Sequence, residues 1–167
     1  MKSWAMCFAV FAVWACSETE LVSDFTGRET VYALQAASEY PVSGTVTFKE
    51  RKDGQTTVLV ELNGTSGPAQ HPVHLHLGDL ATADADIAAL LTPLTAATGQ
   101  SETRLARLAD ETAVTYTDLI GLRASVKIHL ADIGPERDII LAAGNIGQAF
   151  AESVASGRTS VAICKSN

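Results

Sequence analysis

Apolar and polar residues alternate along much of this chain, with a period of two. Residues 43–50 (SGTVTFKE) set two apolar side chains against threonines and a lysine, and residues 56–64 (TTVLVELNG) repeat the alternation. The intervening RKDGQ contains Asp53 and Gly54, a pair typical of tight turns. The pattern therefore predicts a β-hairpin over residues 43–64.

The same alternation predicts further strands on both sides of this hairpin, at residues 29–36, 72–77, 102–111 and 124–134, the last ending in a turn. Residues 79–102 are alanine-rich. Their apolar residues fit helical spacing in part, but Pro93 interrupts that spacing, so a short strand within a long connection is expected. Many short strands separated by turn signals indicate an antiparallel sandwich or barrel.

The remaining segments are expected to be short elements. Residues 115–122 have the composition of a capped helical turn, with Thr115 or Thr117 as the cap and Asp118 in the first turn. Residues 137–147 fit either a strand or a short helix that enters a glycine turn. Residues 152–163 are predicted to form a final strand or hairpin.

Composition places the chain among single-domain globular proteins. Of 167 residues, 47% are hydrophobic and 19% are charged, which argues against disorder. The net charge of −7 provides no basic surface, so nucleic acid is excluded as a predicted partner.

The N-terminus has the features of a secretory leader. Lys2 precedes an apolar run from Trp4 to Ala15, which is shorter than the approximately 20 residues that a spanning helix needs. The run ends in VWAC, which resembles the lipobox of bacterial lipoproteins, and this resemblance implies lipidation at Cys16. An ordinary signal peptide with a chance cysteine is the alternative.

These features predict three parts: a signal peptide at 1–15, a lipidated tether at 16–27 and one β domain at 28–167. The predicted location is the bacterial cell envelope. There a lipid is expected to hold the chain on the outer membrane, which the chain does not span. The predicted partner is therefore the membrane itself. After loss of the leader and lipidation of Cys16, only Cys164 is free, so no disulfide framework is expected.

Three of the four histidines fall within HPVHLHLGD, residues 71–79. His74 and His76 alternate with apolar residues, so on a strand they share the face opposite the aliphatic side chains, about 6.6 Å apart. His129 occupies the equivalent place in VKIHL, residues 126–130. If these two strands are neighbours, the three imidazoles can converge.

Three imidazoles with an open fourth position suit copper or zinc, and copper has the higher intrinsic affinity for nitrogen ligands. The candidate metal ligands are His74, His76 and His129. His71, which lies before Pro72 at the loop end of the strand, is placed better for a structural hydrogen bond. The alternative is a polar strand face that holds no metal.

HPVHLHLGD resembles the signature of copper,zinc superoxide dismutases that carries two copper-binding histidines, and KIHLADIG resembles the segment with the last copper histidine. The family's bridging and zinc histidines have no counterpart between His76 and His129, so no zinc site of that type is expected. Gln148 stands where that family has an arginine.

From about residue 29, the hairpin, the HxH strand and the IHLADIG…AAGNIG segment together resemble the CHRD (chordin-type) domains of bacterial envelope lipoproteins. The resemblances imply an all-β, antiparallel Greek-key sandwich of the immunoglobulin-like or superoxide-dismutase-like kind. The predicted function is an envelope binding or structural module that can hold one copper ion. The alternatives are a copper-only superoxide dismutase-like enzyme and a scaffold without metal.

Overall fold

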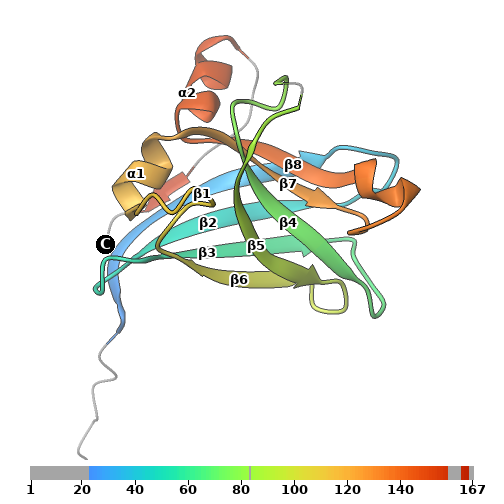
Figure 1. Cartoon of the computed structure of the whole chain (residues 1–167), viewed down its shortest axis with the longest axis horizontal. Coiled ribbons are helices and arrows are strands. Elements are labelled where there is room, and N and C mark those ends of the chain that lie inside the picture. Colours follow the sequence, from blue (N-terminus) through green and yellow to red (C-terminus); the bar gives the residue numbers. More distant parts are fainter. Residues whose placement is uncertain (1–22, 83, 158–162, 166–167) are drawn as a thin grey trace, which may run out of the picture.

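A computed structural model describes residues 23–82, 84–157 and 163–165 of the chain. Its described residues form one antiparallel sheet of nine strands and two short α-helices (Figure 1). The strands are β1 (Phe25–Ala36), β2 (Ser43–Arg51), β3 (Thr56–Asn63), β4 (Gln70–Leu77), β5 (Ile87–Thr95), β6 (Gln100–Leu105), β7 (Arg123–His129), β8 (Ile140–Ile146) and β9 (Ile163–Lys165).

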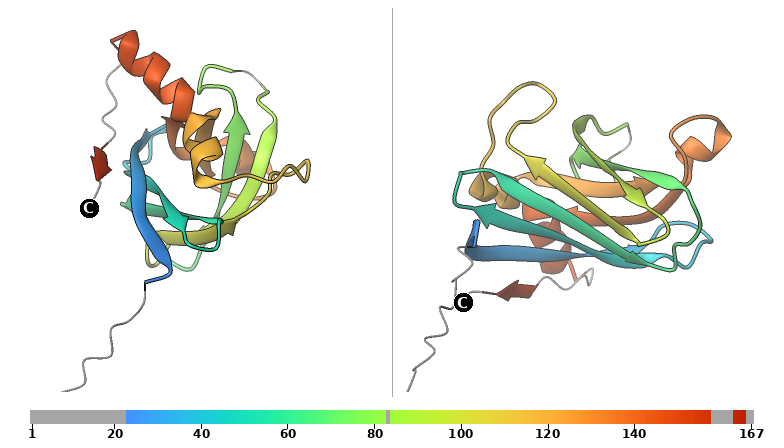
Figure 2. Two further views of the ribbon diagram at one scale, coloured as in Figure 1. Left: turned by 90° about the vertical axis from the view of Figure 1, so that its left-hand side faces the viewer. Right: turned by 90° about the horizontal axis from the view of Figure 1, so that it is seen from below.

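The sheet closes into a barrel, which is clearest in the end-on view of Figure 2. The strands follow the order β2-β3-β6-β5-β4-β7-β8-β1, and β1 pairs with β2 to complete the ring, while β9 adds to β1. The prediction of an antiparallel all-β fold is confirmed. The division into two sheets of a sandwich is not confirmed, because the hydrogen-bonded ladder runs around the whole ring.

The alternating pattern fills this barrel. Inward side chains of every strand from β1 to β8, together with Leu119, form one core, whose largest fully buried members are Leu34, Val46, Phe48, Val58, Val60, Val73, Leu75, Leu94, Leu119, Val126, Ile128 and Ile146. The predicted hairpin is present as β2 and β3. Its turn uses Gly54 at φ +83°, a conformation that glycine adopts without steric cost.

Helix α1 (Tyr116–Gly121) packs at one end of the barrel (Figure 2). Its predicted cap is confirmed, since the Asp118 amide donates to the Thr115 hydroxyl and the Thr115 amide donates to the Asp118 carboxylate. Buried Tyr116 and Leu119 belong to the core. The helix therefore helps to cover the apolar interior at this end.

The prediction for residues 152–163 is wrong at its start, because Gly147–Ala155 form helix α2 instead of a strand. Gln148, Ala149 and Glu152 are helix formers, and the buried Ala149 and Ser153 are four residues apart on one helical face. Packing of this face against β7 and β8 favours the helix. Residues 158–162 lie outside the described residues, and the last strand is only β9.

The other uncertain segments are settled by the structure. Residues 87–95 form strand β5, residues 140–146 form strand β8 after a 3-10 turn at Pro135–Asp138, and β6 ends at Leu105, before the predicted limit of residue 111. The predicted leader and Cys16 lie outside the described residues. Within the described part of the chain, no helix has the length and apolar character required to cross a bilayer.

Candidate metal site

The two histidine-bearing strands are direct neighbours. Strand β4 pairs antiparallel with β7, and His74 lies across from Lys127 while His76 lies across from Ser125. Directly opposed residues in an antiparallel pair project from the same face of a sheet. Because the alternating aliphatic residues of both strands occupy the core, the histidines project from the outer face of the barrel.

The three rings converge there. The ring centroid of His74 is 5.7 Å from that of His76 and 4.7 Å from that of His129, and the centroids of His76 and His129 are 6.2 Å apart. One ring nitrogen from each histidine can be chosen so that all three lie within 4.8 Å of one another. Around an ion with bonds of about 2.1 Å the nitrogens would be about 3.4 Å apart, so small side-chain rotations suffice.

Two backbone carbonyls orient two of the rings. His76 Nδ1 lies 2.9 Å from the Ala85 carbonyl oxygen, in the loop between β4 and β5. His129 Nδ1 lies 2.8 Å from the Arg137 carbonyl oxygen, in the segment between β7 and β8. A carbonyl only accepts, so these contacts require a proton on Nδ1 and leave a lone pair on Nε2.

Those Nε2 atoms are buried, and neither has a hydrogen-bond partner among the described residues. The hydroxyl of Ser125, opposite His76, is also buried without such a partner. Buried polar atoms in folded proteins nearly always have partners, so each exception needs an explanation. Two ring nitrogens with free lone pairs in one cluster make an arrangement that a ligand bound between them would complete.

Burial lowers the pKa of two of the three histidines, His74 and His76. Loss of solvent is the main cause that lowers the pKa of His74 to about 4, and the neighbouring rings of His129 and His76 contribute to the same shift. Burial likewise lowers the pKa of His76, against the hydrogen bond to Ala85. Neutral imidazoles are the form that binds metals, so at neutral pH no proton has to leave these two rings.

Charged residues flank the cluster. Asp132 raises the pKa of His74, whereas Arg137 lowers it, and Lys127 lowers the pKa of His76. A pocket beside His74 is lined by Asp132, by Gln70 and mostly by apolar side chains of β4 and β5. The open side of the cluster at His74 is therefore bordered mainly by apolar surface, with one carboxylate.

His71 lies apart from the three converging rings. Its side chain is buried, and its Nδ1 is 3.0 Å from the Leu130 carbonyl oxygen, which links β4 to the end of β7. The structure thus brings together His74, His76 and His129 and leaves His71 in a contact with the backbone.

The sequence did not reveal the groups around the rings. Ala85 and Arg137 act through their carbonyl oxygens, which carry no residue signature. Lys127 is the exception, because the alternation predicts that it shares the outward face with His129. Comparisons with protein-family models and with curated proteins gave no match.

Proposed function

We propose that this protein binds one metal ion, with copper as the natural ion, through His74, His76 and His129. The observation that carries the proposal is the pair of buried, unpartnered Nε2 atoms on His76 and His129, each ring being oriented by a carbonyl oxygen at Nδ1. Such outer hydrogen bonds are the usual support of metal-binding histidines. A polar strand face without metal offers no reason to bury two free lone pairs.

The donor set favours copper or zinc over harder ions. Three imidazole nitrogens form the group, and none of its members is a carboxylate or a thiolate. Calcium and magnesium prefer oxygen ligands, whereas imidazole suits copper and zinc, with copper higher in intrinsic affinity. Three protein ligands also leave one coordination position for water or a small molecule.

The setting of this site is part of the proposal. Lipidation at Cys16 would hold the barrel at a membrane surface of the bacterial envelope, with strand β1 beginning at Phe25, nine residues further along the chain. The site would then face the aqueous space at that surface. The proposed relationship is to CHRD-type envelope domains.

The Greek-key assignment also belongs to this proposal. Strands β4, β5 and β6 are consecutive neighbours, and β7 returns to pair with β4, which gives the order β7-β4-β5-β6. This order is the one that defines a Greek key. It supports kinship with the Greek-key folds of the immunoglobulin and superoxide dismutase kinds.

A copper-only superoxide dismutase is the second candidate, favoured by the open position that three histidine ligands leave. Copper, when bound, would supply the change of oxidation state, and the residues of this chain would hold and orient it. Superoxide consumption by the copper-loaded protein should exceed that of the same copper in buffer. A rate equal to that of free copper would dismiss the enzyme and leave the binding function untouched.

The binding function is tested by metal titration of the purified chain against a chromophoric chelator. One copper ion per chain should bind, and His74→Ala should weaken the affinity by at least about 100-fold, since outer-shell changes alone cost about 10- to 100-fold. His71→Gln is the matched control, because it removes a histidine outside the cluster. Equal affinities in the wild-type chain and in the His74 variant would refute the proposal.

A further inference from the structure

Lys127 lies immediately beside the three histidines. It pairs directly with His74 across the β4–β7 ladder and precedes His129 by two residues on β7. The Cβ atoms of directly opposed residues are about 5 Å apart and their side chains share a face. The base of the lysine side chain is therefore next to the metal-binding cluster.

The charge of Lys127 is not neutralised locally. Its side chain is half-buried, and it forms no ion pair or hydrogen bond with any residue that the structure describes. Asp132 and Arg137 carry opposite charges and act on His74 in opposite directions. Lys127 therefore leaves the histidine cluster with an excess positive charge beside it.

This excess charge affects ions according to their valence. The Coulomb repulsion between the ammonium and a bound cation is proportional to the charge of that cation, so it is twice as large for Zn²⁺ or Cu²⁺ as for Cu⁺. Imidazoles bind a metal ion in their neutral form, so these ligands cannot offset this difference. The half-buried setting weakens solvent screening of the repulsion.

We infer that Lys127 is a specificity-determining residue, which biases the three-histidine site toward monovalent copper over divalent ions. The inference rests on the proposed function, because it concerns which ion the same site accepts. The chemical role inferred for the protein is therefore to hold Cu⁺. Zn²⁺ and Cu²⁺, which also prefer imidazole ligands, are disfavoured by their second positive charge.

The test compares Cu⁺ and Zn²⁺ affinities in one anaerobic, reducing, chloride-free buffer, by chelator competition. Lys127→Met keeps the alkyl chain and removes the charge. Its Cu⁺ affinity should rise between about three- and tenfold, and its Zn²⁺ affinity by about the square of that factor. The control is Lys52→Met, in the β2–β3 turn, since β6 and β5 separate these strands from β4 in the sheet. Neither affinity should change there.

Asp132→Asn provides the reciprocal variant and does not depend on how Lys127→Met folds. Loss of this carboxylate should lower the Cu⁺ affinity and lower the Zn²⁺ affinity by about the square of the same factor. If the two ions respond by equal factors in both variants, or do not respond, the inference is overturned while the metal site stands. If neither ion binds in a manner that requires His74, the proposed function falls and this inference falls with it.

Discussion

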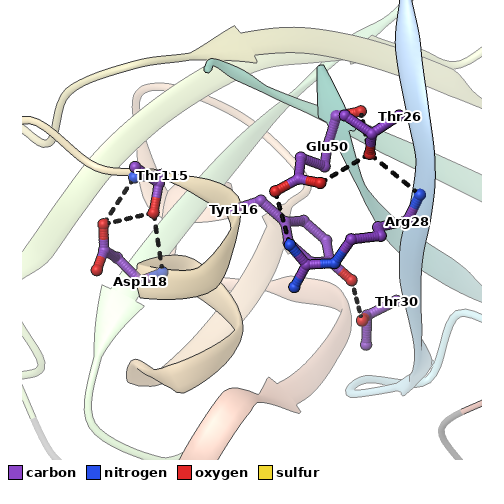
Figure 3. A network of polar contacts seen from close by, with 7 residues as sticks. All are labelled: Thr26, Arg28, Thr30, Glu50, Thr115, Tyr116 and Asp118. Atoms are coloured by element: carbon purple, nitrogen blue, oxygen red, sulfur yellow. Dashed lines mark hydrogen bonds and ion pairs between the residues drawn. The ribbon is translucent and has the colours of Figure 1, made fainter. Parts of the chain in front are cut away.

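Two polar clusters in this barrel differ in whether their hydrogen bonds are complete. The first joins β1, β2 and α1, where the Thr30 and Tyr116 hydroxyls lie 2.6 Å apart and Arg28 bonds to Glu50 and covers the Tyr116 ring (Figure 3). The second is the histidine cluster of β4 and β7. There two rings have hydrogen-bond partners only at Nδ1.

The difference is the one expected between a structural network and the proposed binding site. A buried hydroxyl pair stabilises the fold only when both partners are present, so the first cluster is complete in itself. The second cluster carries the desolvation cost of free lone pairs and gains nothing from them in the folded chain alone. An incomplete polar cluster of this kind is expected where a ligand supplies the missing bond.

The largest effect should follow from replacing a ligand by an apolar side chain. In His76→Leu, metal affinity should fall by at least about 100-fold, since one of three nitrogens is lost. Stability of the metal-free chain should change by less than about 1 kcal/mol, because a free buried lone pair leaves together with the bond to Ala85. Chelator competition and urea unfolding measure the two quantities. A large loss of stability together with unchanged metal affinity would contradict this expectation, because it would make the histidine cluster a structural network.

Metal should in turn stabilise the wild-type fold. At a free ion concentration of about 100 times Kd, binding to the native state alone adds about 2.7 kcal/mol to the free energy of unfolding. Thermal unfolding with and without copper or zinc checks this value. His129→Ala should show no such gain, whereas a gain of the same size in that variant would place the ion elsewhere.

The opposite response is expected for the cluster that contains Thr30 and Tyr116: its disruption should lower stability and leave metal affinity unchanged. Tyr116→Phe removes one hydroxyl and leaves Thr30, which is 7% exposed, without that partner, so stability should fall by about 1–2 kcal/mol. Metal affinity should stay at the wild-type value. Urea unfolding measures the stability, and metal titration of the same sample measures the affinity. Weaker metal binding in this variant would show that the two clusters are coupled, contrary to their expected independence.

The last expected effect is the pH dependence of the metal-free chain. The pKa of His74 is about 4 in the fold, against an ordinary value of 6.5, so the unfolded chain binds more protons between these values. The neutral His74 side chain therefore makes its full contribution to stability above pH 6.5, and this contribution is lost as the pH falls towards 4. His74→Leu should remove that part of the slope in unfolding measured across this range. An unchanged slope would show that His74 does not titrate as described.

Strand periodicity was sufficient to predict most of the fold and the outward direction of the site histidines. The alternation around His74, His76 and His129 predicts side chains on the face opposite the aliphatic residues, and the structure places them there. The pairing of β4 with β7 could not be predicted in the same way. The chain between these strands includes β5, β6 and α1, and the pattern of single strands does not specify which of them become neighbours. That choice depends on closure of the whole barrel, in which β7 returns to the free edge of β4.

The rest of the site and α2 required the folded chain for different reasons. The carbonyl oxygens of Ala85 and Arg137 belong to loops, and every residue type carries such an oxygen. Helix α2 replaces the expected strand because packing of Ala149 and Ser153 on the barrel outweighs a weak local pattern. The loops that shield the outward histidines have no periodicity from which their position could be predicted.

The most direct test of the central claim is an NMR measurement of the histidine ring nitrogens during titration with Zn²⁺ or Cu⁺, both diamagnetic. We expect His76 and His129 to carry the proton on Nδ1 in the metal-free chain. One ion per chain should then shift the Nε2 signals of both residues and one ring nitrogen of His74, and leave His71 unchanged. Shifts confined to a single histidine, or spread equally over all four, would contradict a shared three-histidine site.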